Sequence, residues 1–137
     1  SLAKNKSKLR RLGITHLINC AQGPSQINTD QRYFMDVGIR FFGIRGLDAP
    51  WFDLTPYFQP AAEFIESALK SGGRVYVHCW AGVSRSATIV LAYLMLKKGM
   101  RLNDAHRLVA SKRFIYPNFG FKKQLSYVDS RLRHRPR

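Results

Sequence analysis

Residues 74–95 read RVYVHCWAGVSRSATIVLAYLM, and the architecture expected for the whole chain follows from this segment. Arg74 to His78 is rich in apolar and β-branched residues. Cys79 to Arg85 is short and turn-prone, and Ser86 to Met95 is almost wholly apolar. The pattern predicts a buried strand, a tight loop and a buried helix in succession.

Similar patterns elsewhere predict that strands and helices alternate along the chain. Further strands are expected at residues 14–19 and 39–44, and a long surface loop at residues 21–38. Helices are expected at residues 4–12, 55–70, 86–98, 103–113 and 121–132. The alternation predicts an α/β fold with a mainly parallel sheet and helices on both faces. At 137 residues the chain has room for a single domain.

The junction between the central strand and helix carries the residue types of a phosphate site. The backbone N–H groups of a tight loop and the positive end of a helix dipole form a cup for a tetrahedral oxyanion. The same donors favour a thiolate, so Cys79 is the candidate nucleophile. Arg85 offers a planar fork of donors to two phosphate oxygens, which a lysine does not. We interpret the junction as an active site, although a lone cysteine is more often structural.

The remaining residues of the junction have roles that suit this interpretation. The hydroxyl of Ser86 is available to the sulfur when the thiolate leaves again, and His78 is placed to fix the loop through hydrogen bonds. Gly82 permits the dihedral angles of a tight loop. The predicted substrate-binding cup is formed by the backbone of Trp80, Ala81, Gly82, Val83, Ser84 and Arg85.

The segment His78–Ser86, HCWAGVSRS, matches the pattern HCxxGxxR[ST] and resembles the cysteine-dependent protein tyrosine phosphatases. The later stretches SATIVLAYLM and YPNFGFKKQL are similar to the small atypical dual-specificity phosphatases. The resemblance implies one catalytic domain over residues 1–137, with a sheet of about four to five strands. The family usually has a further strand or two before residue 12, so either these strands are missing at the N-terminus or the sheet is shorter, and a basic tail is expected from about residue 131.

The activity implied by the resemblance is metal-independent dephosphorylation of phosphotyrosine and phosphoserine or phosphothreonine in proteins, through a cysteinyl-phosphate. Two alternatives remain open at this point. One is a phosphoinositide or RNA phosphatase of the same superfamily, which the positive charge would suit. The other is a non-catalytic module that binds phosphorylated proteins.

Phosphate ester cleavage of this kind needs a carboxylic acid to protonate the leaving oxygen. Asp48 follows the predicted strand at residues 39–44, so its loop opens on the same carboxyl edge as the cup if the strands are parallel. Asp53 is the alternative, but it directly precedes the helix start at Thr55, where a structural role is available. The resemblance also favours Asp48, because the family places an aspartate several residues before this helix.

Three further expectations concern residues outside the junction, and the resemblance contributes the second-phosphate role and the disulfide. Arg113 matches the position at which some dual-specificity enzymes bind a second phosphate; its alternative role is to complement a helix dipole. Cys20 would lie near Cys79 and form a protective disulfide, or else be a buried inert thiol. Asn118 and Gly120 are expected to hold the loop behind the cup.

The net charge of +15 is large for so short a chain, and it is concentrated in KNKSKLRR (residues 4–11) and RLRHRPR (residues 131–137). Such ends attract polyanionic surfaces, or are simply solvated. Two cysteines without a secretory leader indicate a reducing compartment, so a cytoplasmic or nuclear location is expected. No membrane span, dedicated nucleic-acid motif, metal site or cofactor is expected, since no apolar run is long enough and the histidines lack ligand spacing.

Overall fold

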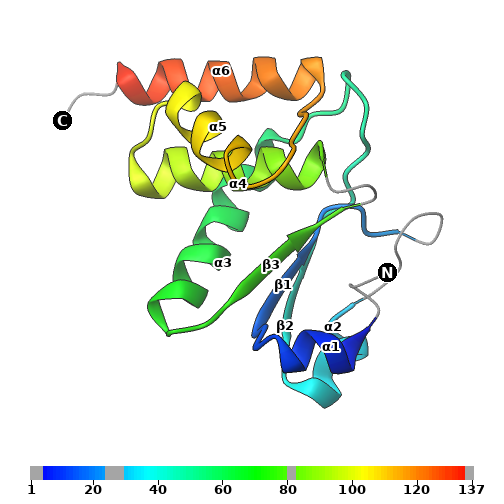
Figure 1. Cartoon of the computed structure of the whole chain (residues 1–137). Helices are drawn as coiled ribbons and strands as arrows, with labels where there is room; N and C mark the ends of the chain where they lie inside the picture. Colours follow the sequence, from blue (N-terminus) through cyan, green and yellow to red (C-terminus); the bar gives the residue numbers. More distant parts are fainter. Residues whose placement is uncertain (1–4, 24–29, 80–82, 135–137) are drawn as a thin grey trace.

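The computed structural model describes residues 5–23, 30–79 and 83–134 (Figure 1). Its sheet consists of β1 (His16–Asn19), β2 (Arg40–Gly43) and β3 (Val75–His78), in the order β2-β1-β3. Both pairings are parallel, as predicted. The carboxyl ends of the strands therefore meet at one edge, where residues 45–53 and the junction at Cys79 both begin.

The number of strands in the prediction was wrong. Three strands are present among the described residues, against the expected four to five. Only three runs of the sequence have the apolar, β-branched character of a buried strand, and the further strands had been expected from the family resemblance alone. In the described part of the chain, β3 is consequently an edge strand.

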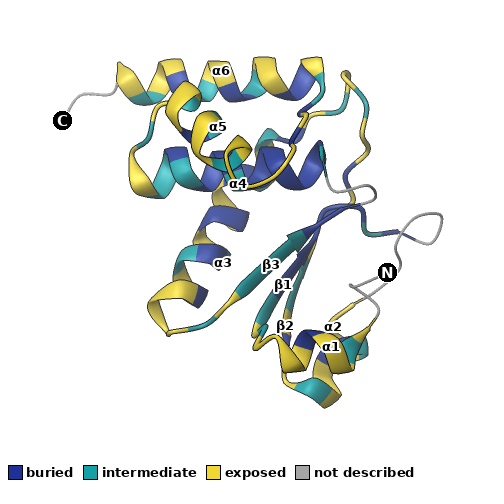
Figure 2. Ribbon diagram, in the orientation of Figure 1, coloured by how far each residue is buried: buried dark blue, intermediate teal, exposed yellow. Residues whose placement is uncertain are grey.

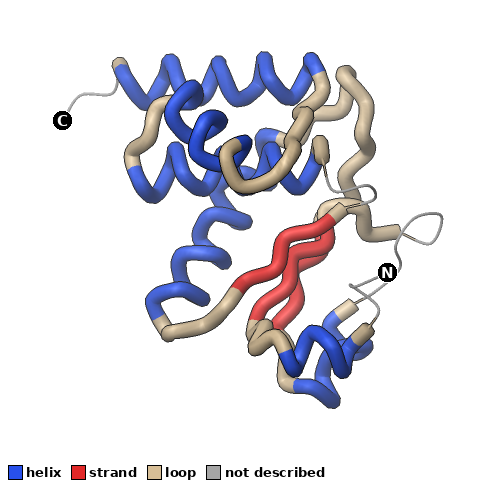
Figure 3. Tube along the Cα trace, in the orientation of Figure 1, coloured by secondary structure: helices blue, strands red, loops and turns tan. Residues whose placement is uncertain are grey.

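Side chains alternate between the two faces of the sheet, and each face has its own apolar cluster. Ile18, Phe42 and Val77 belong to the larger cluster, together with α3 (Phe58–Lys70) and α4 (Arg85–Lys98). On the other face, the smaller cluster includes Leu17, Phe41 and Tyr76, together with residues of α1 (Lys6–Arg11) and α2 (Gln31–Phe34). Helices thus cover both faces, as predicted, and Figure 3 shows the strands between the two groups.

The helix α4 is the centre of the larger layer. It packs against α3 and also against α5 (Leu102–Ala110) and α6 (Phe119–Arg133), so that it is covered on several sides. Figure 2 shows that its residues are mostly buried, which explains why the sequence from Ser86 to Met95 is almost wholly apolar. Gly99 ends the helix in the left-handed conformation, with φ 66°.

The expectation of one long surface loop at residues 21–38 was wrong in its second half. Asp30 caps α2 by accepting a hydrogen bond from the backbone N–H of Tyr33 at 3.0 Å. The ring of Phe34 is fully buried and stacks on Phe41 at 5.7 Å between centroids. A 3₁₀ turn, η2 (Met35–Val37), follows directly. A single helical turn is too short to leave a periodic pattern in the sequence.

Helix boundaries differ from the predicted ones by a few residues. The Thr55–Pro56 start forms a 3₁₀ turn, η3 (Thr55–Tyr57), before α3 begins. The helix α5 ends three residues early, at Ala110, whereas α6 extends to Arg133. The first residues of the expected basic tail are therefore helical. In the described part of the chain, no helix combines the length and the apolar character that crossing a membrane requires.

Candidate active site

Cys79 directly follows β3 and faces the first turn of α4. Its sulfur accepts a hydrogen bond from the backbone N–H of Ser86 at 3.4 Å and lies 3.3 Å from the Ser86 hydroxyl oxygen. The sulfur thus sits at the positive end of a 14-residue helix, where a negative charge is stabilised. Cys79 keeps 7% of its surface exposed, so it forms the base of the site and not its rim.

Three predicted cup residues, Trp80, Ala81 and Gly82, lie outside the described residues. Arg85 is the first residue of α4 and is 4% exposed. Its guanidinium donates a hydrogen bond to the carbonyl of Gly46 at 2.9 Å. This bond joins the start of α4 to the loop that carries Asp48.

Gly46 has a role that the sequence analysis missed. A Cβ atom at this position would lie 2.8 Å from the carbonyl oxygen of Cys20, so only glycine allows the loop to approach β1 and offer its carbonyl to Arg85. The only local signal was a glycine directly after the loop begins, at Arg45-Gly46. The contacts that require it come from residues distant in the chain.

The two candidate acids have different surroundings. Asp48 is exposed, and one of its carboxylate oxygens accepts a hydrogen bond from the side-chain amide of Asn118 at 2.9 Å. Asp53 accepts two hydrogen bonds from Thr55, from the backbone N–H at 3.0 Å and from the hydroxyl at 2.6 Å. Asp53 therefore has the structural role at the helix start that the sequence indicated, while Asn118 holds Asp48 beside the junction.

The segment at residues 116–120 supports the second half of the cup. The backbone N–H of Tyr116 donates to the carbonyl of Val83 at 2.6 Å, and that of Asn118 donates to the hydroxyl of Ser84 at 3.0 Å. A Cβ atom on Gly120 would lie 1.9 Å from the carbonyl oxygen of Pro50, so α6 begins in direct contact with the loop of Asp48. Asn118 thus contacts the cup, as expected, and also the acid, whereas the close contact of Gly120 is with the loop of Asp48.

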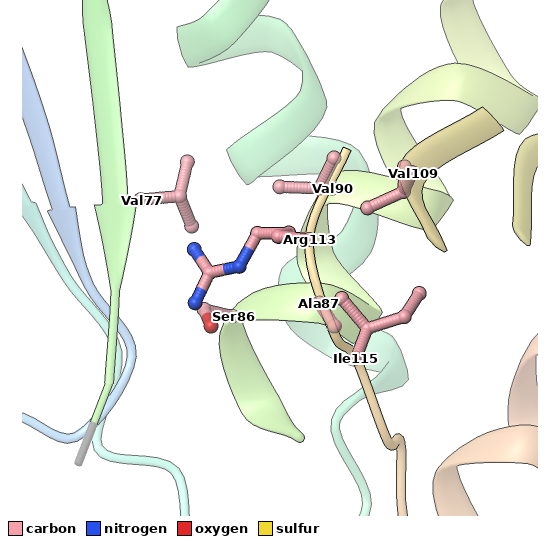
Figure 4. A pocket seen from close by; sticks show the side chains of 7 residues that line it. All are labelled: Val77, Ser86, Ala87, Val90, Val109, Arg113 and Ile115. Carbon is pink, nitrogen blue, oxygen red and sulfur yellow. The ribbon is translucent and has the colours of Figure 1, made fainter. Parts of the chain in front are cut away.

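Arg113 is exposed and lines a small cavity of about 30 Å³ between β3, α4 and α5. Figure 4 shows its guanidinium between Val77 and Ser86. Burial raises the pKa of Tyr76 on the same strand, and the nearby charge of Arg113 opposes that shift. Arg113 therefore contributes positive charge near the junction.

His78 and Cys20 flank the nucleophile on the sheet side. The ring of His78 is 5% exposed and stacks on Tyr76, with centroids 5.4 Å apart and planes 15° apart. Burial lowers the pKa of His78 to about 4, so the ring is neutral at physiological pH. Its Nε2 atom has no hydrogen-bond partner among the described residues, so the bonds expected to fix the loop are not among the described contacts.

Cys20 is fully buried at the end of β1, and its backbone N–H donates to the carbonyl of His78 at 2.8 Å. Burial raises the pKa of the Cys20 thiol well above its usual value; the nearby Cys79 raises it further and Arg85 opposes the shift. Both cysteines are free. These surroundings suit the inert-thiol alternative, because a neutral thiol is a poor nucleophile, and the disulfide with Cys79 stays a prediction.

The described residues thus place a sulfur, a guanidinium and a carboxyl group around one helix N-terminus. This combination provides a nucleophile, a fork for phosphoryl oxygens and a proton donor or acceptor. Among the same residues, no group of three His, Cys, Asp or Glu side chains is placed to hold a metal ion.

Comparisons with known proteins agree with this chemistry. A family model described as the dual specificity phosphatase catalytic domain matches residues 1–131. The chain is 47% identical over 131 residues to human dual specificity protein phosphatase 13B, covering 95% of this chain and 66% of that protein. It therefore spans about two thirds of the length of that curated relative.

Solved structures show the same fold. The crystal structure of human DUSP28 is similar with a TM-score of 0.79 and 30% identity, over 96% of this chain and 85% of that one. The crystal structure of a human tyrosine phosphatase-like serine/threonine/tyrosine-interacting protein is similar with a TM-score of 0.77 and 33% identity, over 90% of this chain and 82% of that one.

Proposed function

We propose that this chain dephosphorylates phosphotyrosine and phosphoserine or phosphothreonine in proteins. The chain belongs to the dual specificity phosphatase family, which is the basis of the proposal. The observation that carries the proposal is the position of the Cys79 sulfur, 3.4 Å from the backbone N–H of Ser86 in the first turn of α4. Arg85 lies in the same turn, so nucleophile and phosphate-binding cation share one rigid element.

In the first step, the Cys79 thiolate attacks phosphorus in line with the ester oxygen. The S–P bond forms as the P–O bond breaks, and Asp48 gives its proton to the leaving oxygen. The Arg85 guanidinium and the loop amides hold the equatorial oxygens, which is the positioning and charge stabilisation that phosphoryl transfer mainly needs.

In the second step, water attacks the cysteinyl-phosphate. Asp48, now a carboxylate, takes a proton from this water, and the S–P bond breaks to release inorganic phosphate. The N–H and hydroxyl of Ser86 stabilise the returning thiolate, since both lie within 3.4 Å of the sulfur. Asp48 thereby acts as acid and then as base.

A more specific proposal about the substrate concerns Arg113. Its guanidinium lies beside Ser86 in a cavity next to the junction, so its charge would favour a substrate with a second phosphate close to the first. The basic ends of the chain would contact polyanionic surfaces. The reduced state that a catalytic thiolate needs fits the cytoplasm or the nucleus.

The test is hydrolysis of an aryl phosphate by the protein and two matched cysteine variants. Cys79→Ser should abolish turnover, because serine is not ionised at this position, whereas Cys20→Ser should retain it. Vanadate should inhibit and chelators should not. Full activity of Cys79→Ser would refute the mechanism. Absence of turnover in the parent chain, with phosphopeptide binding retained, would favour a non-catalytic module. The similarity to the human tyrosine phosphatase-like interacting protein is the reason to test this alternative.

The substrate class is tested separately. Phosphopeptides, inositol phosphates and RNA 5′-triphosphate should be compared at equal concentration. The proposal expects the highest kcat/KM for phosphopeptides, and a higher value for either other substrate would replace it with the corresponding alternative.

A further inference from the structure

Exposed apolar side chains gather on two segments next to the catalytic junction. Trp51 follows Asp48 by three residues and is 74% exposed, and Phe119 follows Asn118 and is 66% exposed. Single exposed apolar side chains are ordinary on a protein surface, but several that lie together mark a site of contact with another molecule. The set on these two segments comprises Leu47, Trp51, Phe114, Tyr116 and Phe119, which we call the aromatic rim.

The two segments of the aromatic rim touch each other. The Asp48–Asn118 hydrogen bond of 2.9 Å joins them, and Gly120 lies against the carbonyl of Pro50. In Figure 1 the two segments run beside each other above the carboxyl edge of the sheet. The rim is therefore one surface built from residues far apart in the sequence.

The aromatic rim is also fixed to the cup. The backbone N–H of Tyr116 donates to the carbonyl of Val83 at 2.6 Å, and Arg85 donates to Gly46 at 2.9 Å. Hence both segments of the aromatic rim border the cup, next to the position of a phosphorylated residue bound at Cys79.

Positive charge accompanies the rings. The ammonium group of Lys122 lies 4.9 Å from the centre of the Tyr116 ring, and that of Lys123 lies 4.5 Å from the centre of the Phe119 ring. Arg45, Lys112 and Arg113 lie on the same segments or next to them, whereas the acids there are Asp48 and Asp53, both already assigned roles. The surface thus combines apolar area with excess positive charge.

We propose that the aromatic rim binds the polypeptide flanking the phosphorylated residue and selects apolar and acidic flanking side chains. This inference rests on the proposed phosphatase function and adds its substrate preference. Apolar side chains would pack on the rings, and carboxylates would meet the ammonium groups of Lys122 and Lys123. A nucleic acid is an outcome of the test and not the proposal, because rings and ammonium groups also suit bases and phosphates, whereas the chain belongs to the dual specificity phosphatase family.

The test compares three substrates on one enzyme: a small aryl phosphate, a phosphotyrosine peptide flanked by leucine and glutamate, and the same peptide flanked by serine. The ratio of kcat/KM for the first peptide to that for the aryl phosphate should fall about tenfold in Trp51→Ala and in Phe119→Ala. Phe119→Leu should recover part of the ratio, because it restores an apolar contact. Lys122→Gln with Lys123→Gln should reduce the preference for glutamate flanks over serine flanks.

The matched control is Tyr127→Ala. Tyr127 is 61% exposed, as is Tyr116, and it also carries a cation over its ring, Arg131 at 5.6 Å, but it lies in the second half of α6. Its removal should leave the ratio unchanged. Aryl phosphate turnover reports separately on the proposed function, so the two ideas fail in different ways.

Two outcomes would overturn the inference. One is equal kcat/KM for the two peptides in the parent protein. The other is a loss in the rim variants that appears with a 5′-phosphorylated oligoribonucleotide and not with the phosphopeptides, which would assign the surface to RNA.

Discussion

Asp48 and Asp53 lie five residues apart in one loop, yet their contacts assign them different work. Asp48 bonds to Asn118 across the chain, whereas Asp53 satisfies the backbone N–H and hydroxyl of Thr55 at the start of η3. We predict that Asp48→Asn lowers kcat about 10²-fold for esters whose leaving group needs a proton, the usual size of a general-acid contribution. Steady-state kinetics on alkyl and nitrophenyl phosphates measure this.

Asp53→Asn is the matched control for that prediction. It should leave kcat nearly unchanged and lower the free energy of unfolding by about 1 kcal/mol, because it weakens hydrogen bonds at a helix start. Urea unfolding gives this value. The opposite result, a large kinetic loss in Asp53→Asn alone, would transfer the acid role to Asp53.

His78 makes the stability of the protein depend on pH. Burial lowers the pKa of its folded state to about 4, while the unfolded chain titrates near the ordinary value of 6.5. Between these values the unfolded state binds more protons, so this contribution is complete above pH 6.5 and is lost as the pH falls towards 4. We predict that the free energy of unfolding falls by up to roughly 1.4 kcal/mol per pH unit within this window.

Urea unfolding at pH 7 and pH 5 measures the slope. His78→Asn should flatten it, and His134→Gln, which changes an exposed histidine beyond α6, should not. An unchanged slope in His78→Asn would mean that other groups cause the dependence.

For single residues, the sequence predicted which side chains meet when these residues lie close together along the chain. Cys79, Arg85 and Ser86 are separated by one loop, so their proximity was predictable from the strand–loop–helix pattern. Gly46 was not predictable, because its requirement comes from Cys20 and Arg85, which meet it only in the folded chain. The same holds for the bond between Asp48 and Asn118, 70 positions apart.

Among the elements, the start of α6 determines the position of the loop that carries Asp48. A Cβ atom on Gly120 would lie 1.9 Å from the Pro50 carbonyl oxygen, so an alanine must push the loop or the helix aside. We predict that Gly120→Ala costs about 1–3 kcal/mol of stability, as overpacking does. It should also lower kcat more for poor leaving groups than for good ones, because Asp48 moves with the loop. Kinetics with a series of aryl leaving groups measure this.

Gly73→Ala is the control for that series. Its Cβ atom would lie 2.5 Å from the Thr15 hydroxyl, so it also strains the fold, but at the amino edge of the sheet, opposite the site. It should lower stability without changing the dependence on the leaving group. If both variants gave the same dependence, loss of stability would explain it and the link between α6 and Asp48 would be refuted.

The predictability of each element followed its length. The 13-residue α3 and the 14-residue α4 carry enough residues to show their periodicity or their uniform burial. The four-residue α2 does not, and it is specified by the cap at Asp30 and the burial of Phe34. Strand count failed for another reason, since it was taken from relatives and not from runs of β-type sequence in this chain.

For the whole molecule, the position of the charges matters more than their sum. The helix α1 lies at the amino edge of the sheet, and β1, four residues long, separates it from the carboxyl edge by about 13 Å. The helix α6 has 15 residues, so its basic C-terminal end lies about 20 Å from its own N-terminal end, which is next to the site. Arg10 and Arg11 of α1 and Arg131 and Arg133 of α6 are therefore farther from the mouth of the site than the Debye length of about 8 Å at physiological salt.

This geometry predicts which charges speed substrate capture. At about 0.15 M salt, replacing Arg10 and Arg11 with glutamine should change kcat/KM for an acidic phosphopeptide less than twofold, because screening hides α1 from the mouth. Replacing Lys122 and Lys123, also two charges, should lower it several-fold, since they lie at the aromatic rim. At about 0.01 M salt, where the Debye length is about 30 Å, replacing either pair should lower kcat/KM for this peptide. Equal effects of the two pairs at 0.15 M would show that the net charge of +15 acts as a whole, and that the ends of the chain take part in substrate encounter.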